Sequence, residues 1–348
     1  MNYNILLGLT GSVGSVLHEK LKYELSRIVD KVTTVATNSA IQFIPDFNKL
    51  NYLHDSSEKQ YTKGDSVLHI DLGIDNDIFV IAPASANTIP KLANGISDNL
   101  LTTTILAKPW YKPCIICPAM NTRMWENPIV QNNIKTLEKY GFIIVPPQTK
   151  LLACGEFGDG AMCEIDVLLS TIIKTVQWEF PLKFCTGIPR SKHHGDSHPG
   201  AFGSVRKHDI HTGIDLYTNE FESVYAVETG VIIKIEQFTG KNVGSPWWND
   251  TDCILIQGTS GNVCYGEIKV QEHLKIGDRI NKGDAIGMVV SVLPKSKIRQ
   301  DIEGHSNSML HLELYHRSKT TICNDIYEVG LRDPTPHLLY NNKYNYLH

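Results

Sequence analysis

The stretch LLACGEFGDGAM, residues 151–162, places one cysteine among three glycines and two acidic residues. A loop this rich in glycine is mobile, and a cysteine in a mobile loop is rarely there for packing. Cys154 is therefore a candidate metal ligand, disulfide partner, nucleophile or proton donor. The zinc role is weak, because the spacing to Cys163 and the lack of a neighbouring histidine do not form a ligand pair.

The stretch GLTGSVGS, residues 8–15, joins a strand-like run to a helix-like run. Such a turn offers backbone N–H groups and a helix N-terminus to an anion, typically a cofactor phosphate. Its glycine spacing departs from GxGxxG, which argues against NAD. Thr37 and Ser39 follow the next strand and would add hydroxyl groups to the same phosphate. The simpler alternative is a tight strand–helix junction without a ligand.

The elements that must position these residues alternate between strand-like and helix-like runs over the first ~180 residues, as in a parallel α/β fold. The periodicity predicts helices over 13–28, 127–141 (closed by Gly141) and 165–178. Buried strands are expected at 4–9, 31–37, 77–83, 113–119 and 142–147. Cys114 and Cys117 lie in one of these strands, on opposite faces, so both are predicted to be core residues.

The second half of the chain has a different texture. Residues 181–197 are polar and turn-rich, which predicts a linker, and His193, His194 and His198 in and beside it are expected to be solvated. From residue 201 onward β-type runs alternate with Gly and Asp turns, so this unit is expected to be all-β. The predicted division is 1–180, 181–197, 198–340 and a tail over 341–348.

Composition narrows the function classes. The 348 residues are 42% hydrophobic and 20% charged, as in a globular protein with real cores, and the net charge of −4 gives no reason to expect nucleic acid. No apolar run is long enough to span a membrane, and no signal peptide is visible. We therefore expect a cytoplasmic protein whose eight cysteines are free thiols.

Several motifs together resemble those of the flavin-dependent cysteine decarboxylases, over about residues 3–178. They are VLHIDL (67–72), APASANT (82–88), ANGISDNLLT (93–102), PAMNTRMW (118–125) and LLACGEFGDGAM. The resemblance implies a Rossmann-like (flavodoxin-like) parallel sheet that binds FMN. The residues matching the family's flavin contacts, or lying in the turns expected to hold its phosphate, are Gly11, Ser12, Val13, Thr37, Ser39, Ser85, Ala86, Asn87, Thr88 and Ala119.

The same resemblance assigns catalytic roles. His69 matches the base near the substrate thiol, Asn121 matches the residue that holds the substrate carboxylate, and Met124 lies beside the substrate. An imidazole is poised near neutral pH for such a role. Cys154 matches the cysteine that protonates the ene-thiol left by decarboxylation. The structural alternative for His69 is a buried, hydrogen-bonded histidine on a strand.

The flap motif ACGxxGxGAM favours the coenzyme A branch of this family, which converts phosphopantothenoylcysteine into 4′-phosphopantetheine. A small-molecule substrate and a homotrimer with shared active sites are then expected by resemblance. Two alternatives remain open. One is a peptidyl-cysteine decarboxylase that leaves an ene-thiol on a peptide, and the other is a catalytically silent flavin-binding protein with a regulatory role.

The segment HPGAFGSVRKHDIHTGID (198–215), with MLHLELYH (309–316), resembles lysostaphin-type zinc endopeptidases and the leukocyte cell-derived chemotaxin group over about 198–338. His211, Asp215 and His311 match the zinc ligands. The peptidases carry histidines where this chain has Met309 and Glu267, and those histidines handle the proton of the attacking water. The resemblance thus implies a zinc-binding, non-proteolytic β module, with a peptide or a glycan as its candidate ligand.

Overall fold

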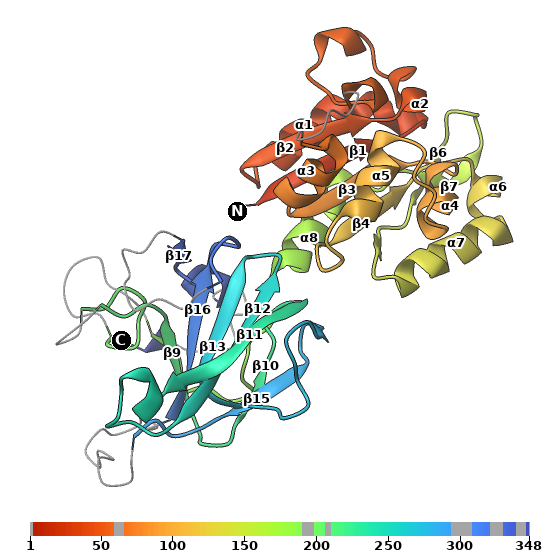
Figure 1. The fold of residues 1–348 in the computed structure, drawn as a ribbon. Helices are drawn as coiled ribbons and strands as arrows, with labels where there is room; N and C mark the ends of the chain where they lie inside the picture. Colours follow the sequence, from red (N-terminus) through yellow and green to blue (C-terminus); the bar gives the residue numbers. More distant parts are fainter. Residues whose placement is uncertain are drawn as a thin grey trace. The chain divides into compact units, whose positions relative to one another are not determined.

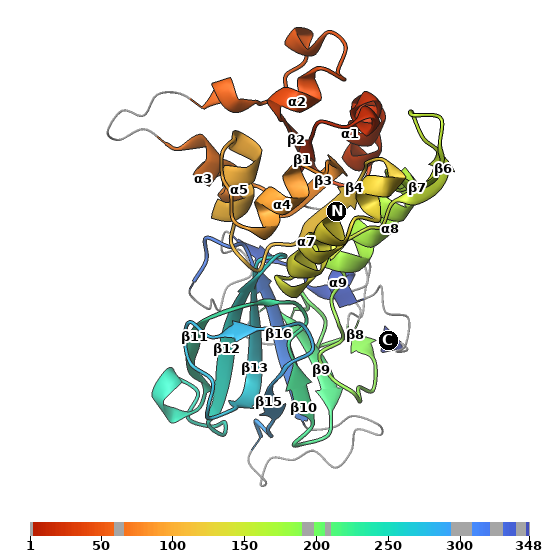
Figure 2. The ribbon, with the colours of Figure 1, turned by 90° about the vertical axis from the view of Figure 1, so that its right-hand side faces the viewer.

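The chain folds into two compact units, Met1–Thr175 and Val176–His348, which we describe separately. The structure is a computed structural model that describes residues 3–58, 66–189, 198–205, 210–293, 308–320, 330–338 and 346–347. Figure 1 shows an open sheet with helices in the first unit and mostly strands in the second, and Figure 2 shows the same from the side. Among the described helices, none has the length and apolar character needed to cross a membrane.

A five-stranded parallel sheet in the order β2-β1-β3-β4-β5 forms the first unit. Its strands are β1 (Asn4–Leu9), β2 (Lys31–Ala36), β3 (Ile78–Ala84), β4 (Cys114–Pro118) and β5 (Ile143–Ile144). This is the flavodoxin-like strand order, and it confirms the five strands predicted from the sequence, although β5 is shorter than expected. Both faces of the central strands are buried, which explains their continuous apolar runs.

Helices cover this sheet. On one face, Phe79, Ile81 and Ile116 pack in a single apolar cluster with residues of four helices. The helices of the unit are α1 (His18–Ser26), α2 (Asn38–Ile41), α3 (Leu68–Asp75), α4 (Thr88–Ala93), α5 (Leu100–Ala107), α6 (Thr122–Trp125), α7 (Pro128–Lys139) and α8 (Ile165–Val176), and the cluster involves α3, α4, α5 and α7. Gly141, with φ of +83°, follows the end of α7 as predicted. Cys114 and Cys117 are buried core residues, also as predicted.

Two helical segments differ from the sequence expectation. The predicted helix over 13–28 begins as a 3₁₀ turn, Val13–Leu17, and continues as α1. His69 lies on helix α3, so the strand that we considered for it is wrong. The C-terminal carbonyl groups of α3 and its following residue accept hydrogen bonds from the buried Lys112 ammonium, at 3.1 Å for Gly73 and 2.7 Å for Asn76. This cap comes from a distant segment, so the local sequence does not reveal it.

The glycine-rich stretch around Cys154 is a β-hairpin. Strands β6 (Gln148–Leu151) and β7 (Phe157–Ala161) pair antiparallel, and Cys154 lies in the turn between them. Gly155 and Gly160 have φ of +83° and +153°, values that other residues rarely adopt. The glycines that suggested a loop without secondary structure are therefore positions where the hairpin needs unusual backbone angles.

The second unit is dominated by antiparallel strands, as expected. One sheet contains the path β10-β15-β13-β12-β11-β14, with β16 joining β13 to β9 and β17. Its strands are β9 (Ile214–Thr218), β10 (Ser223–Tyr225), β11 (Gly230–Thr239), β12 (Thr251–Gly258), β13 (Asn262–Val270), β14 (Arg279–Ile280), β15 (Ala285–Val289), β16 (Ser308–Tyr315) and β17 (Leu331–Arg332). The second unit also contains a short helix, α9 (Thr335–Leu338), and the strand pair β8 (Ile188–Pro189) and β18 (Tyr346–Leu347).

The predicted linker differs most from the structure. The boundary falls between Thr175 and Val176 rather than after residue 180. Leu182, Cys185 and Ile188 are 2%, 7% and 4% exposed and pack in the core of the second unit. Residues 181–189 are thus part of the β unit, whose apolar core stabilises this otherwise turn-rich segment. The rest of the predicted linker, with His193 and His194, lies outside the described residues, and so does most of the 341–348 tail.

Candidate functional site

The site of the first unit lies where the turns after β1 and β3 meet. In an open α/β sheet of this order, ligands bind at the carboxyl ends of the strands, where the strand order reverses between β1 and β3. Thr10 links the two turns by hydrogen bonds. Its Oγ1 donates to the Pro83 carbonyl at 2.8 Å and accepts from the Ser85 N–H at 2.7 Å.

A polar cavity of about 320 Å³ opens at this point, and its lining contains six of the ten residues expected to contact flavin, two of which it shares with a neighbouring cavity. Gly11 must be glycine, because a Cβ there would lie 2.6 Å from the Cβ of Ser39. Thr37 is buried, and its Oγ1 has no hydrogen-bond partner among the described residues. A buried hydroxyl group without a protein partner is suited to form a hydrogen bond with a ligand oxygen such as that of a phosphate. The expected residues here are Gly11, Thr37, Ser39, Ser85, Asn87 and Thr88.

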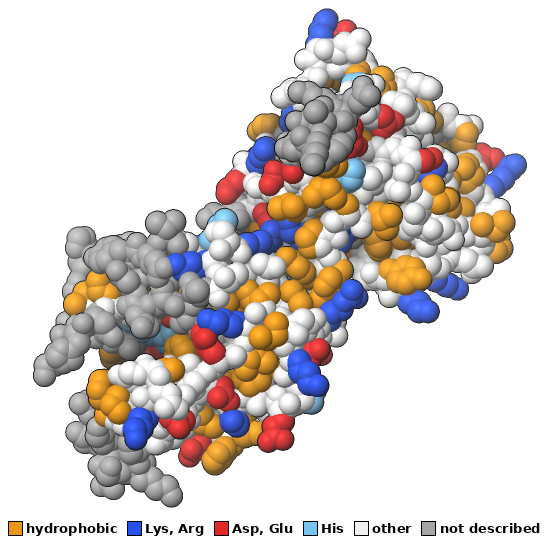
Figure 3. All heavy atoms as spheres, viewed as in Figure 1, with side chains coloured by type: hydrophobic (Ala, Val, Ile, Leu, Met, Phe, Trp, Pro, Cys, Tyr) orange, Lys and Arg blue, Asp and Glu red, His pale blue; other side chains and the backbone are white. Residues whose placement is uncertain are grey.

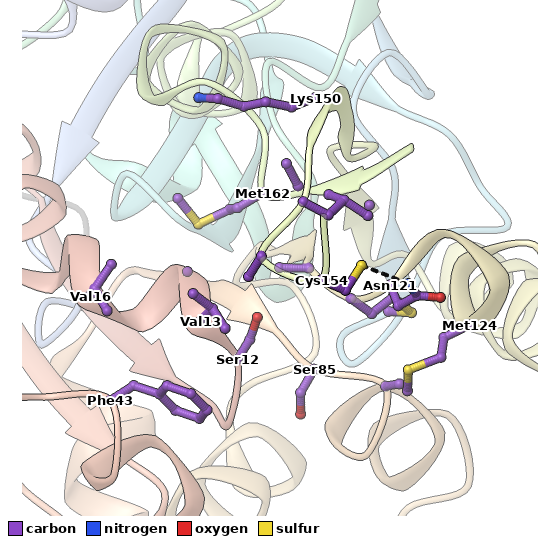
Figure 4. A pocket seen from close by; sticks show the side chains of 18 of the residues that line it. Ser12, Val13, Val16, Phe43, Ser85, Asn121, Met124, Lys150, Cys154 and Met162 are labelled. Atoms are coloured by element: carbon purple, nitrogen blue, oxygen red, sulfur yellow. Dashed lines mark hydrogen bonds between the residues drawn. The ribbon is translucent and has the colours of Figure 1, made fainter. Parts of the chain in front are cut away.

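A second, more apolar cavity of about 510 Å³ adjoins the first through the shared residues Gly11 and Ser85. In Figure 4, Val13, Val16 and Phe43 lie on one side of it, and Cys154 and Asn121 lie on the other. The remaining expected residues of the site also line it, namely Ser12, Ala86, Ala119 and Met124. The structure thus brings all ten predicted flavin residues to two adjoining cavities, one polar and one apolar, as a phosphate and a planar ring would require.

Asn121 begins helix α6 and is oriented by it. Its side-chain Oδ1 accepts a hydrogen bond from the Arg123 N–H at 2.9 Å, which is an N-cap contact. The amide NH₂ group is therefore directed to the other side, where it donates to the Cys154 Sγ at 3.2 Å. A side chain held in this way presents donors, which suits the recognition of a carboxylate.

A carboxylate of the chain itself already lies on this amide. Asn121 Nδ2 is 3.0 Å from Glu156 Oε2, and the other oxygen of Glu156 accepts from Arg123 Nη2 at 2.8 Å. The hydrogen bond from Asn121 and the charge of Arg123 lower the pKa of Glu156, so it is ionised at neutral pH. Cys154 Sγ lies 3.9 Å from the same carboxylate.

His69 is the predicted residue that the structure does not bring to this cluster. It lies on α3, where its Nδ1 is 2.5 Å from Glu58 Oε1. It is not among the described residues that line either of the two cavities. Within one copy of the chain, the described lining of the apolar cavity thus contains Asn121 and Cys154 but not the candidate base.

Other residues of the site carried no recognisable signal in the sequence. Phe43 and Gln148 line the apolar cavity, and Lys91 lines the polar one. Their positions depend on how distant segments pack. Glu156 is the exception, since its place two residues after Cys154 in the flap motif was visible.

The second unit contains a buried cluster of three possible metal ligands, His211, Asp215 and His311, which the sequence predicted. Asp215 and His311 are directly opposite each other on β9 and β16. Asp215 Oδ1 is 3.0 Å from His211 Nε2 and 2.8 Å from His311 Nδ1, and the two ring nitrogens are 3.2 Å apart. Two imidazoles and a carboxylate converging in this way match the donor set of zinc sites.

The electrostatics of this cluster also fit a cation. Burial alone would raise the pKa of Asp215, but the two neighbouring imidazoles hold it below its usual range. Burial alone would lower the pKa of His311, but its bonds to Asp215 and Glu313 raise it to about 10. A positive charge is therefore stabilised between these carboxylates, and a metal ion would take the place of a proton.

Three further residues of the second unit were named in the sequence analysis, and the structure shows their surroundings. His198 is only 9% exposed and its Nδ1 accepts from the Gly200 N–H, so the expectation that it is solvated is wrong. Glu267 is buried, with φ of +62°. Met309 pairs with Tyr217 across β16 and β9.

All seven cysteines in the described ranges are free thiols.

The face of the molecule seen in Figure 3 carries charges of both signs. In Figure 3, acidic and basic side chains are interspersed over the described residues in view. This agrees with the small net charge of −4.

Comparison with known proteins identifies the first unit. The profile of the family described as Flavoprotein matches residues 1–177. A phosphopantothenoylcysteine decarboxylase of Oryza sativa subsp. japonica is 43% identical over 173 residues, which are 48% of this chain and 78% of that protein. A probable phosphopantothenoylcysteine decarboxylase of Streptococcus mutans is 38% identical over 175 residues, 49% of this chain and 98% of that protein.

Among solved structures, a cysteine-to-serine mutant of a PPC decarboxylase, complexed with pantothenoylaminoethenethiol, is similar to this chain. It is 37% identical, with a TM-score of 0.47, and the match covers 49% of this chain and 97% of the other. The family match extends over half of the chain and contains every flavin-site residue described above. This chain therefore belongs to the Flavoprotein family.

Proposed function

We propose that the first unit is an FMN-dependent decarboxylase that converts phosphopantothenoylcysteine into 4′-phosphopantetheine. The observation that carries the proposal is the contact between the Asn121 amide and the Cys154 thiol, 3.2 Å apart, at the wall of a cavity formed by predicted flavin residues. The relatives that bear the name of this activity are 43% and 38% identical to the chain.

The two cavities suit FMN. The hydroxyl groups of Thr37, Ser39 and Ser85, with the backbone at Gly11, would hold the phosphate, and the apolar cavity would hold the ring. When bound, the flavin supplies the two-electron chemistry that converts the substrate thiol into an electron sink for the leaving CO₂. The cavities then have to hold the substrate beside the ring and exclude water.

The side chains of the chain have three tasks in this reaction. Asn121 binds the substrate carboxylate, as its contact with the Glu156 carboxylate illustrates, and a neutral amide does so without opposing loss of the charge. His69 takes the thiol proton. Cys154 delivers a proton to the ene-thiol carbon after CO₂ has left, since its Sγ already faces Asn121.

For His69, we propose that the active site is shared between copies of the chain in a homotrimer. The support is its position on α3, outside the described lining of both cavities. Co-expression tests this: His69→Asn and Cys154→Ser chains, each defective alone, should regain phosphopantetheine formation when mixed. A shared site is refuted if mixed oligomers are no more active than the separate variants.

The activity itself is tested on the purified chain. Visible absorption reports bound FMN, and incubation with phosphopantothenoylcysteine should release CO₂ and form phosphopantetheine. Asn121→Asp is the matched variant, because it keeps the size of the side chain and the N-cap acceptor while replacing the donors that face the substrate. A flavin-loaded chain that forms neither product would overturn the proposal.

We further propose that His211, Asp215 and His311 bind zinc in a non-proteolytic β module. The support is the convergence of the three donor atoms and their burial, since the side chains of His211 and Asp215 are each 2% exposed. Glu267 and Met309 occupy the places of the peptidase histidines, and methionine cannot move a proton. Metal analysis of the purified chain should find one zinc per chain, lost in His211→Ala. A zinc content that this variant leaves unchanged would place the metal elsewhere.

A further inference from the structure

Glu313 is a buried acid beside the metal cluster that the proposed zinc site does not use as a ligand. It is 1% exposed and lies on β16, two residues after His311. A buried carboxylate is costly unless it is fully hydrogen-bonded. Its Oε1 accepts from Thr212 Oγ1 at 2.6 Å, and its Oε2 accepts from the Tyr315 hydroxyl. The chain thus holds this carboxylate in one orientation.

The orientation matters because the Glu313 carboxylate lies beside His311, a proposed metal ligand, at the ring nitrogen that faces away from the cluster. His311 Nε2 is 3.1 Å from Glu313 Oε1, while His311 Nδ1 faces Asp215 and His211. A carboxylate can only accept here, so the Nε2 carries the hydrogen and Nδ1 keeps its lone pair for the cluster.

The backbone closes the Nε2 edge of the ring as well. A Cβ on Gly213 would lie 2.8 Å from His311 Nε2 and 2.9 Å from the Glu313 Cγ. Only glycine at this position leaves room for the ring and its carboxylate partner. The His211 ring is oriented in a similar way by a hydrogen bond on the side away from the cluster, where its Nδ1 donates to the Ala201 carbonyl at 3.0 Å.

The motif HTGID therefore contains two proposed metal ligands and two further residues that support the site. His211 and Asp215 face the cluster, Thr212 holds Glu313, and Gly213 makes room for His311. The distance in sequence between Thr212 and Glu313 is 101 residues, so the arrangement exists only in the folded unit.

We propose that Glu313 is a positioning residue of the metal site, which fixes His311 as an Nδ1 ligand and thereby strengthens metal binding. The inference rests on the proposed zinc site. Partners of this kind orient ligating histidines and raise their basicity, and their loss typically costs about 10–100-fold in metal affinity.

The experiment measures zinc affinity of the full chain by competition with a chromophoric chelator. Glu313→Gln should bind zinc about 10–100-fold more weakly than the wild type. Thr212→Val and Tyr315→Phe, which each remove one donor to Glu313, should give smaller losses. The matched control is Glu228→Gln, because Glu228 is also a buried carboxylate of this unit but bonds to Ser260 instead. It should leave the affinity unchanged.

A second readout separates positioning from general support of the fold. In the zinc-loaded wild type, long-range ¹H–¹⁵N spectra should show the His311 ring protonated at Nε2 and bound through Nδ1. Coordination through Nε2, or an affinity of Glu313→Gln equal to that of Glu228→Gln, would overturn the role of Glu313 and leave the metal site standing. If the wild type itself binds no zinc, both proposals fall. Decarboxylase activity on the same samples is an independent result.

Discussion

Gly160 seats the hairpin that carries Cys154 against the segment that carries Asn121. Its carbonyl accepts a hydrogen bond from the Met120 N–H at 2.9 Å, and its φ is +153°. A Cβ built on Gly160 would lie 2.1 Å from the Met120 carbonyl oxygen. The change Gly160→Ala therefore acts on the contact that aligns the two proposed catalytic elements.

The size of the effect follows from the geometry. Ordinary van der Waals contact begins at 3.4 Å, against 2.1 Å at this position, so the hairpin must withdraw by roughly 1 Å. The obstacle is backbone, which cannot rotate away. Cys154 and Asn121 are 3.2 Å apart, and a displacement of about 1 Å removes this contact. Misplacement on this scale can lower a rate by about 10²-fold, and we expect such a fall in the protonation step that completes phosphopantetheine.

The assay is single-turnover product analysis with phosphopantothenoylcysteine, in which CO₂, ene-thiol and phosphopantetheine are measured separately. Gly155→Ala is the matched control. Gly155 also has a positive φ, +83°, but a Cβ there meets nothing within 4 Å. Both variants carry backbone strain, and only Gly160→Ala carries the collision with Met120. If Gly160→Ala makes phosphopantetheine as fast as Gly155→Ala, the inferred seating of the hairpin is wrong.

Three further outcomes are expected. Cys154→Ser should release CO₂ but accumulate the ene-thiol, with reduction slowed at least ~100-fold; normal phosphopantetheine formation by this variant would refute the proton-donor role. Glu156→Gln should lower KM for phosphopantothenoylcysteine about two- to five-fold, because the ionised carboxylate on Asn121 competes with that of the substrate; a raised KM would show that Glu156 helps binding. Burial raises the pKa of Glu228 from 4.5 to about 7, so protonated Glu228 adds stability that is complete below pH 4.5 and is lost as the pH rises through 7, about 3 kcal/mol in all. The difference in unfolding free energy between Glu228→Gln and the wild type should therefore grow in favour of the variant between pH 5 and 8, and a constant difference in denaturant unfolding would contradict this.

The sequence predictions that agree with the structure are those that depend on a local pattern of residues. The apolar runs of the five parallel strands are long enough to identify buried strands directly, since burial on both faces requires continuous apolar residues. Cys114 and Cys117 were placed in the core for the same reason. The ten residues expected to contact flavin all line the two cavities, because each lies in a turn at the carboxyl end of a strand or on the helix that follows one, and their contact with FMN stays a prediction.

Predictions failed where a distant segment decides the conformation. Helix α3 is capped by Lys112, from a segment that follows α3 and β3, so the local sequence did not reveal the helix on which His69 lies. His198 and residues 181–189 look polar and turn-rich, but His198 is buried, and Leu182, Cys185 and Ile188 pack in the core of the β unit. The hairpin around Cys154 depends on positive φ at its glycines, a property that composition alone equates with a mobile loop.

The sequence by itself determined the kinds of element, the residues able to do chemistry and their order along the chain, because periodicity and motif spacing are local properties. Only the tertiary structure decided which of these residues meet. It joined Asn121 to Cys154 and Glu156 across 33 and 35 residues, and His211 to His311 across 100. It also left His69 outside the described lining of both cavities. Contacts over such distances depend on how the sheets and helices pack, and no local pattern records that packing.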